Sequence, residues 1–592
     1  MAACQTPLTT GDPVSILDSI FRSAIRSVLG DEYRDADPVI RASQKPEFGD
    51  YQANGVMSLA KQVKTNPREL AGRIADAAAQ GLDAIAEPPE VAGPGFINIR
   101  LRATALASML SAMDTPTLGL QPDTDTRPIV IDLCGVNIAK QMHVGHLRST
   151  IIGDTLARIL ERCGRTVHRQ NHLGDWGLTI AMVLHELRST GSDLEALSLD
   201  DLDAAYHTAQ TRDDETDQAR QTLIRLQQGD EELHRDWRKI IDVTMRAVYE
   251  SFEVLGAGLG PEHNRPESFY RDRLAQVVDD FLAAGLAVED QGAIIVRFPD
   301  ADRPPLIIRK SDGGFLYSTT DLAAVRYRVQ ELGACRVIYV VDARQRQHFR
   351  DVFDAVRLIG WNRLPDGSAA ELIHVPFGSV LGTDHKPLKT RSGENVSLAS
   401  LLDEAIGRAT AEVRDRAAVA GSHTHDLPDE TLAAIGRAVG IGAVKYADLS
   451  NDLVRDYVFN LDRMIAFEGN TGPYLQYAHA RVCSIFAKAG LDGEAAAGGP
   501  YLIGEAAEKR MALLLLSYRG VIRDVASSLE PHRLCTYLFE LANAYSSFYE
   551  TCPVIRAEPQ ELRQSRLGLC RLVRRVLADG LDLLGIEAPT RM

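Results

Sequence analysis

The chain has 592 residues, of which 45% are hydrophobic and 25% are charged, and its formal net charge is −16. A chain of this length builds several hydrophobic cores, so three or four domains are expected. No apolar run reaches membrane-spanning length, which argues against an integral membrane protein. The acidic balance does not indicate a nucleic-acid-binding protein, but it does not exclude one, because only the contacting face must be basic.

The eight cysteines are scattered along the chain and include no Cys-x-x-Cys pair. This spacing argues against a zinc ribbon and is typical of reduced thiols in a cytosolic protein. The first fifteen residues match neither a secretory signal nor an Arg-rich presequence. We therefore expect a cytoplasmic protein with no membrane association, no metal site and no tightly bound cofactor.

Residues 1–115 are predicted to form a small α/β module. Apolar residues recur at helical spacing over Val14–Leu29 and Gly55–Ala79, and Gly95–Leu101 is typical of an edge strand. The polar, proline-containing segment Thr115–Arg127 has the composition of a linker. A second domain is therefore expected to begin near residue 128.

Residues 128–380 alternate between strand and helix patterns, which predicts an α/β, Rossmann-type doubly wound nucleotide-binding domain. Ile129–Cys134 is apolar with little alternation, as in a buried parallel strand. Gly145–Arg162 has helical spacing, Gly164 supplies a C-terminal stop, and Thr166–Arg169 begins another strand. The free N–H groups at the start of such a helix form a natural phosphate site.

The remaining chain is predicted to complete this sheet and then to become helical. Further strands are expected at Cys335–Val341 and Leu372–Phe377, after a charged helical insertion at about 190–260. Residues 381–430 are expected to be a connecting segment that carries a basic loop, and residues 431–592 an α-helical bundle. A stripe of arginines near the C-terminus is either a solvated face or a phosphate contact; it comprises Arg563, Arg566, Arg571, Arg574 and Arg575.

His143 and His146 stand three positions apart at the predicted junction of strand and helix. Both imidazoles lie on one helical face, and Gly145 between them lets the backbone approach a ligand closely. They can donate hydrogen bonds to phosphate oxygens that gain charge as pyrophosphate leaves. One alternative is half of a metal site, which lacks a third ligand at suitable spacing. The other is a pair of structural histidines.

The segment NIAKQMHVGHLRST, residues 137–150, resembles the HIGH motif of class I aminoacyl-tRNA synthetases, and specifically that of arginyl-tRNA synthetases. FGDYQAN (48–54) and AGPGFINIRL (92–101) are similar to the N-terminal additional domain of that family. FEGNTGPYLQYAHAR (467–481) and the ending LGIEAPTRM are similar to its anticodon-binding bundle. The resemblance implies an arginine–tRNA ligase that activates L-arginine with ATP and transfers it to tRNA(Arg), releasing AMP and pyrophosphate.

The same resemblance implies a KMSKS-like loop at Lys389–Gly393 that closes over the leaving pyrophosphate. This loop departs from the parent pattern, because Arg391 or Ser392 occupies the place of its second lysine. In this family a lysine just before the histidine motif is thought to compensate, which here is Lys140. Mg²⁺ is expected to arrive with ATP as the substrate complex. The implied ATP-binding residues are His143, Gly145, His146, Lys389, Arg391 and Ser392, and the implied catalytic residues are His143, His146, Lys140 and Lys389.

A guanidinium is planar and permanently charged, so its pocket needs rigidly held carboxylates and neutral acceptors. The resemblance implies that Tyr317, Asp321 and Gln345 hold the arginine side chain. It implies that Asp132 and Asn137 hold the α-amino end or orient neighbouring groups. Taken alone, Asp321 would be read as an ordinary helix N-cap.

Two segments near this predicted pocket depart from the family pattern and leave its precise geometry open. Cys134-Gly135-Val136 stands where the family has Ser-x-Pro, and Leu178-Thr179-Ile180 stands where it usually has Thr-Gln-Phe. The expected charged groups are nevertheless all present.

The family relation implies tRNA contacts in both terminal regions, and we expect the enzyme to act as a monomer. The expected tRNA-binding residues are Phe48, Tyr51, Gln52, Asn98 and Tyr446. Without the family relation, Tyr51 is an ordinary core aromatic. Two alternative functions are a catalytically silent tRNA-binding paralogue, which should have lost the histidines or Lys389, and a small-molecule adenylyltransferase, which would not need the terminal regions.

Overall fold

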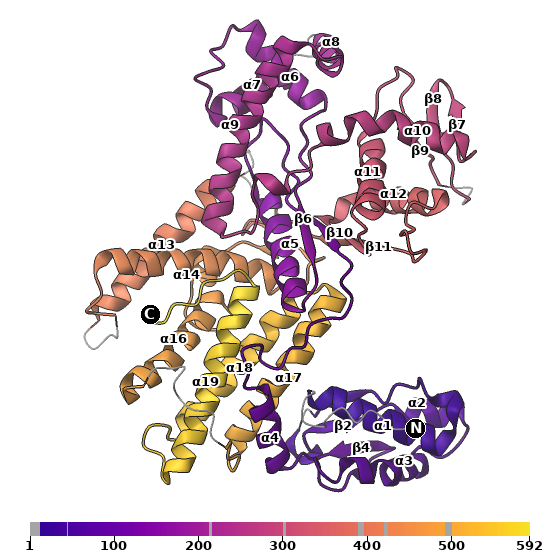
Figure 1. The fold of residues 1–592 in the computed structure, drawn as a ribbon. Coiled ribbons are helices and arrows are strands. Elements are labelled where there is room, and N and C mark those ends of the chain that lie inside the picture. Colours follow the sequence, from indigo (N-terminus) through magenta and orange to yellow (C-terminus); the bar gives the residue numbers. More distant parts are fainter. Residues whose placement is uncertain are drawn as a thin grey trace.

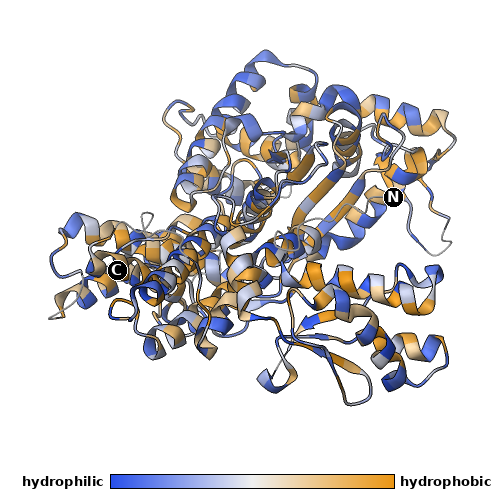
Figure 2. Cartoon of the chain, turned by 60° about the horizontal axis from the view of Figure 1, so that its bottom comes forward, coloured by the Kyte–Doolittle hydropathy of each residue, from blue (hydrophilic) through white to orange (hydrophobic). Residues whose placement is uncertain are grey.

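A computed structural model describes residues 12–43, 45–211, 216–299, 303–388, 396–419, 424–491 and 500–592. The N-terminal unit, the sheet with its insertions and the C-terminal helices occupy different regions of the ribbon (Figure 1). Hydrophobic residues concentrate in the strands of the central sheet, while many helices alternate between hydrophilic and hydrophobic stretches (Figure 2). Within the described residues, no helix combines the length and the apolar character needed to cross a membrane.

The described part of the N-terminal unit has four α-helices and a four-stranded antiparallel sheet of order β1-β2-β4-β3, and α4 contacts α17 (Ala506–Ser528) of the C-terminal region. Two expectations are corrected here. The strand predicted at 95–101 is not at an edge, because β4 pairs with both β2 and β3. The helix predicted over 55–79 is two helices, since Lys64 has a positive φ and Asn66 caps a new helix that starts with Pro67. The elements are α1 (Pro13–Leu29), β1 (Ile40–Ala42), β2 (Tyr51–Ala53), α2 (Val56–Gln62), α3 (Pro67–Leu82), β3 (Glu90–Ala92), β4 (Phe96–Ile99) and α4 (Ala103–Met113).

The central sheet is parallel with the order β11-β10-β5-β6. The chain leaves β5 toward β6 on one side and returns on the other side at β10, so the strand order reverses between β5 and β10. Ligands of doubly wound folds bind at the carboxyl ends of the strands at such a reversal. The predicted strand–loop–helix–strand unit is confirmed as β5 (Ile129–Asp132), α5 (Val144–Arg162) and β6 (Val167–Gln170), and the two later strands as β10 (Arg336–Asp342) and β11 (Glu371–Phe377). The helix α12 (Arg346–Ile359) connects β10 to β11.

Two insertions separate β6 from β10. The first is helical, as predicted, and comprises α6 (Leu178–Ser189), α7 (Leu199–Thr211), α8 (Thr216–Gln227) and α9 (Glu231–Leu255). The second was not predicted. It places a small antiparallel sheet of order β7-β8-β9 beside α10 and leads into α11, which returns the chain to the central sheet. Its elements are α10 (Leu274–Ala283), β7 (Ala287–Asp290), β8 (Ala293–Val296), β9 (Leu306–Arg309) and α11 (Tyr317–Arg326).

The C-terminal region is helical, which confirms the predicted fold class. Its only described strand, β13 (Tyr457–Val458), pairs with β12 (Val380–Leu381) and ties the helices to the end of the sheet. The helices are α13 (Leu398–Ala418), α14 (Asp429–Leu449), α15 (Leu461–Met464), α16 (Gly472–Ala489), α17 (Ala506–Ser528), α18 (His532–Thr551) and α19 (Gln560–Leu583).

The arginine stripe of α19 is largely used inside the protein, which differs from both alternatives considered for it. Arg566 pairs with the fully buried Glu508 of α17 at 2.8 Å. Arg571 and Arg575 both pair with Asp114, at the end of α4. Side chains that hold the linker against the last helix are poor candidates for phosphate contacts.

Candidate active site

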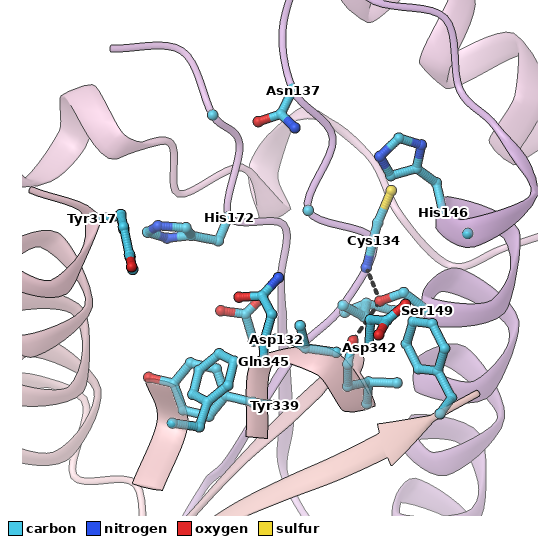
Figure 3. Close-up of a pocket in the computed structure, with 18 of the residues that line it drawn as sticks. Asp132, Cys134, Asn137, His146, Ser149, His172, Tyr317, Tyr339, Asp342 and Gln345 are labelled. Carbon is cyan, nitrogen blue, oxygen red and sulfur yellow. Dashed lines mark hydrogen bonds between the residues drawn. The ribbon is translucent and has the colours of Figure 1, made fainter. Parts of the chain in front are cut away.

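A cavity of about 490 Å³ opens where the strand order reverses between β5 and β10. The end of β5 contributes Asp132, and the end of β10 contributes Asp342. Many residues predicted to bind substrates line this one cavity: Asp132, Asn137, His143, Gly145, His146, Tyr317, Asp321 and Gln345. The figure places His146 on one side and the Tyr317 and His172 rings on the other, with Asp132 and Gln345 between them (Figure 3).

The two histidines of the motif are held in one tautomer by the start of α5. His143 Nδ1 accepts a hydrogen bond from the Gly145 backbone N–H at 3.0 Å, and His146 Nδ1 accepts one from the His143 N–H at 3.2 Å. A nitrogen that accepts carries no proton, so in each neutral ring the proton is on Nε2. A Cβ at position 145 would lie 2.9 Å from the His143 ring, which is why glycine is needed there. The rings stack with centroids 3.9 Å apart and can each offer one N–H to an anion.

Burial keeps both imidazoles neutral. Burial lowers the pKa of His146 to about 3, with further lowering by the neighbouring His143 and Lys140. The pKa of His143 is lowered by burial, then by Lys140 and Arg344. Neutral donors suit a phosphate site because they stabilise the developing charge without exchanging a proton with the nucleotide.

Acid should therefore destabilise the protein partly through His146. Between about pH 6.5 and 3 the unfolded chain protonates this histidine and the folded chain does not, so the free energy of unfolding falls as pH decreases through this window. The variant His146→Asn has no imidazole at this position to titrate. In this pH window we expect its free energy of unfolding to fall less steeply than that of the wild type, by about 1.4 kcal/mol per pH unit. Denaturant unfolding at pH 7.5, 6 and 5 measures how the free energy of unfolding changes with pH, and parallel curves for both proteins would contradict the lowered pKa of the buried His146.

Three predicted arginine-binding residues lie on the opposite side of the cavity. The Asp321 carboxylate accepts a hydrogen bond from His348 at 2.6 Å, with its Oδ2 facing the imidazole Nε2. The Tyr317 ring, which is 62% exposed, stands edge-on to the same imidazole at 4.8 Å. Gln345 lies at the N-cap of α12, the helix that carries His348. Asp321 is in the second turn of α11 and does not cap the helix, whose N-cap is Leu316.

Asp132 has a permanent cationic partner that sequence reasoning missed. The Arg328 guanidinium, which is fully buried, donates to Asp132 Oδ2 at 2.6 Å and to Gln170 Oε1 at 2.8 Å. Arg328 also lies over the Tyr339 ring, 4.9 Å from its centroid. Asp132 therefore brings no uncompensated negative charge to the cavity, and its remaining oxygen can act as an acceptor or orient a neighbour.

His172 and Glu267 also line the cavity and were not predicted. Burial raises the pKa of Glu267, which His172 opposes. The only sequence signal for His172 was its place directly after the predicted strand β6. No signal pointed to Glu267, because it belongs to the second insertion.

Lys140 is not among the described residues that line the cavity. Its ammonium group lies 3.9 Å from the centroid of the Tyr206 ring on α7, in a cation–π contact. The neighbouring Gln141 donates to Asp200 of the same helix at 2.8 Å. The first insertion thus contacts the segment that leads into the histidine motif.

Lys389, Arg391 and Ser392 lie outside the described residues, but the segment that follows them is close to the histidine motif. Ser397 forms a β-bridge with His143, and the Leu398 N–H donates to the Met142 carbonyl at 2.8 Å. The chain therefore passes directly beside His143 within a few residues of the predicted loop.

Of the two departures from the family pattern, the first lies in the site itself, because Cys134 and Gly135 line the cavity. Cys134 has φ of 73°, a left-handed conformation that is unusual for a residue with a side chain. Its N–H donates to Ser149 Oγ at 2.9 Å, and Ser149 in turn donates to the Val340 carbonyl at 2.6 Å (Figure 3). Leu178 is the first residue of α6, and the residues from 178 to 180 do not line the cavity.

The predicted tRNA-binding residues divide by exposure. Tyr51 is 3% exposed and packs in the N-terminal core, and Tyr446 is fully buried, with its hydroxyl donating to Asn470 at 2.6 Å. Neither ring has a free face for a nucleotide, so both predictions are corrected. Gln52 donates to Asn98, which is itself buried, on the face of β2 and β4. Phe48 is exposed and lies 5.9 Å from the Lys45 ammonium group.

Three family models together match most of the chain. The model for "tRNA synthetases class I (R), catalytic domain" matches residues 111–461. The "Arginyl tRNA synthetase N terminal domain" matches residues 15–101, and the "DALR anticodon binding domain" matches residues 475–592.

Full-length relatives agree with these matches. The chain is 45% identical to the arginine–tRNA ligase of Frankia casuarinae over 99% of this chain and 100% of the relative, and 47% identical to that of Laribacter hongkongensis over 93% and 96%. Its structure resembles the arginyl-tRNA synthetase of Plasmodium falciparum with a TM-score of 0.84 and 26% identity, over 99% of this chain and 100% of the other. It resembles the arginyl-tRNA synthetase of Thermus thermophilus with a TM-score of 0.80 and 26% identity, over 98% of this chain and 100% of the other. The chain belongs to the arginyl-tRNA synthetase family of class I aminoacyl-tRNA synthetases.

Proposed function

We propose that this protein is an arginine–tRNA ligase that converts L-arginine and ATP into arginyl-adenylate and pyrophosphate, and then esterifies tRNA(Arg) with release of AMP. One observation carries the chemistry: neutral imidazole donors and a carboxylate-bearing wall face each other across one 490 Å³ cavity at the strand-order reversal. A nucleotide held at the first wall and a guanidinium held at the second would bring the amino-acid carboxylate and the α-phosphorus together between them.

The histidine pair is proposed to stabilise the phosphates during adenylate formation. Its two Nε2–H groups and the N-terminus of α5 offer hydrogen bonds to the oxygens that gain charge as pyrophosphate leaves. Lys140 and Lys389 are proposed as the cations that join them, and Arg391 and Ser392 are proposed as further ATP-binding residues. Mg²⁺ is proposed to enter with ATP, because hard cations of this kind are usually bound through substrate phosphates.

Asp321 is proposed as the main carboxylate for the substrate guanidinium. Because Asp132 is already paired with Arg328, we assign the selectivity for a cation to Asp321 and the neutral acceptors Tyr317 and Gln345, with Glu267 as a second carboxylate in the lining of the cavity. Citrulline should be rejected because its side chain is neutral. Lysine should bind weakly because its ammonium group leaves hydrogen-bond acceptors of the pocket without a donor.

For Asp321→Asn we expect KM for arginine to rise roughly 10- to 100-fold, because a hydrogen bond to a charged group is lost. The measurement is steady-state aminoacylation with arginine varied at saturating ATP and tRNA. The matched variant Asp312→Asn, at an exposed turn that leads toward α11, should leave KM unchanged. An unchanged KM for Asp321→Asn would remove this residue from the arginine site.

The two terminal regions are proposed to bind tRNA. Phe48, Gln52 and Asn98 remain candidates in the N-terminal unit. In the bundle, Tyr549 is exposed and pairs with Arg481 at 4.7 Å, an arrangement that suits stacking on a single-stranded base. We further propose a monomer that acts in the cytoplasm, where the described cysteines, all free, would stay reduced.

Arginine-dependent exchange of pyrophosphate into ATP, run with and without tRNA, tests the proposed function. A ligase supports exchange when tRNA is present and charges tRNA(Arg). A silent paralogue supports neither reaction, and a small-molecule adenylyltransferase exchanges pyrophosphate without charging tRNA. Absence of exchange with tRNA present would overturn the ligase assignment.

A further inference from the structure

His348 lies behind the arginine side of the cavity and touches two of the residues that face it. Its Nε2 is 2.6 Å from Asp321 Oδ2, and the Tyr317 ring stands edge-on to it at 4.8 Å. The imidazole and the Asp321 carboxylate are 12% and 14% exposed, so water competes weakly for this hydrogen bond. His348 is not among the described residues that line the cavity.

The placement of His348 on α12 connects a third residue of the same wall. Gln345, at the N-cap of α12, lines the cavity three positions before His348. The Phe349 ring, which also lines the cavity, stands edge-on to the imidazole with the ring centroids 5.2 Å apart. The start of α12 therefore carries both Gln345 and His348. Through His348 it also contacts Asp321 and Tyr317.

A carboxylate that accepts a hydrogen bond from an imidazole at one oxygen is fixed about its last torsion. Its second oxygen then keeps one direction, which a planar guanidinium needs for a directed charge-assisted bond. Tyr317 needs similar support, because the residue is 62% exposed and little of its surface is held by packing. Losing the imidazole should allow both groups to rotate.

We propose that His348 is a positioning residue for amino-acid recognition: it orients Asp321 through a hydrogen bond and Tyr317 through a ring contact, without touching the substrate. This inference rests on the proposed function, in which the ligand of this wall is the guanidinium of arginine. A residue that acts in this way should change the affinity for arginine and leave the chemical step intact.

Three substitutions separate the two contacts. H348Q places an amide N–H near the position of Nε2 and keeps the bond to Asp321, whereas H348N carries the same amide one methylene shorter and cannot reach it. H348F keeps a ring for Tyr317 and removes the donor. We expect KM for arginine to rise roughly 10- to 100-fold in H348N, which loses both contacts, and by a smaller factor in H348Q and in H348F, each of which keeps one of them.

Aminoacylation kinetics at saturating tRNA give KM for arginine, KM for ATP and kcat for each variant. The kcat at saturating arginine and the KM for ATP should stay within about twofold of wild type, which a general loss of structure would not allow. His207, exposed on α7, provides the matched control, because H207Q and H207N should leave all three parameters unchanged. Melting temperatures identify any variant that fails to fold. If H348F fails to fold, the comparison of H348Q with H348N decides the result.

The D321N variant distinguishes failure of this inference from failure of the proposed site. If D321N raises KM for arginine and H348N does not, the positioning role is wrong and the arginine site stands. If D321N also leaves KM unchanged, the arginine site itself is wrong. A fall in kcat without a change in KM in H348N would likewise overturn the positioning role.

Discussion

Replacing His146 by Asn should lower the rate of arginine-dependent ATP–pyrophosphate exchange roughly 10²- to 10³-fold, the cost of losing one preorganised donor to a developing oxyanion. Asn Oδ1 can take the place of Nδ1 and accept the His143 N–H, so the start of α5 should be preserved. What the variant lacks is the Nε2–H that faces the cavity. The loss should therefore appear in kcat, with little change in KM for arginine.

The variant His146→Gln provides the complementary measurement. Its longer amide carries an N–H close to the position of Nε2, but it no longer matches the contact with the His143 N–H. We expect a smaller loss of exchange than for Asn, together with a lower melting temperature. If the Asn variant exchanged pyrophosphate at the wild-type rate, the imidazole would be structural, which was the alternative considered from the sequence.

The parts of the site that the sequence predicted lie close together in the chain or follow from one resemblance. A strand, a Gly-containing loop and a helix within 40 residues place the histidine motif at the carboxyl end of β5, because local periodicity determines each of these elements. Asp321 and Tyr317 could be assigned because a known motif contains them. Their convergence on the same cavity is a property of the fold, which the structure provides.

The parts that the sequence did not predict depend on contacts between distant residues. Arg328 is 196 positions from Asp132, and nothing near either residue indicates that they pair. The second insertion went unrecognised because its three strands have only four residues each, and it carries Glu267 into the cavity. The remaining errors arose because the sequence does not show which side chains are buried. Tyr51 and Tyr446 have rings that could stack on bases, but packing buries both of them.

Replacing Arg148 by Met should destabilise the protein by about 3–5 kcal/mol, because it leaves a buried carboxylate without its partner. Arg148 and Asp448 are both fully buried and pair at 3.1 Å, which joins α5 to α14. The guanidinium also donates to the Gly378 carbonyl at 2.6 Å, close to the cavity at the end of β11. The double variant Arg148→Met/Asp448→Leu removes the isolated charge and should recover much of the loss, which denaturant unfolding of the three variants can measure.

The pH dependence of the Arg148→Met variant provides a second, independent check. Burial already raises the pKa of Asp448, and Arg148 opposes that effect by favouring the charged form. Without Arg148 the pKa should rise further, so the folded variant holds a proton that the unfolded chain releases above about pH 4. The free energy of unfolding of the variant should then fall as pH increases and recover as pH decreases, so its deficit relative to wild type should be smaller at pH 5.5 than at pH 8. A deficit that is constant between these two values would show that Asp448 stays ionised without its partner, and that the cost lies in lost packing and in the Gly378 carbonyl left without the Arg148 donor.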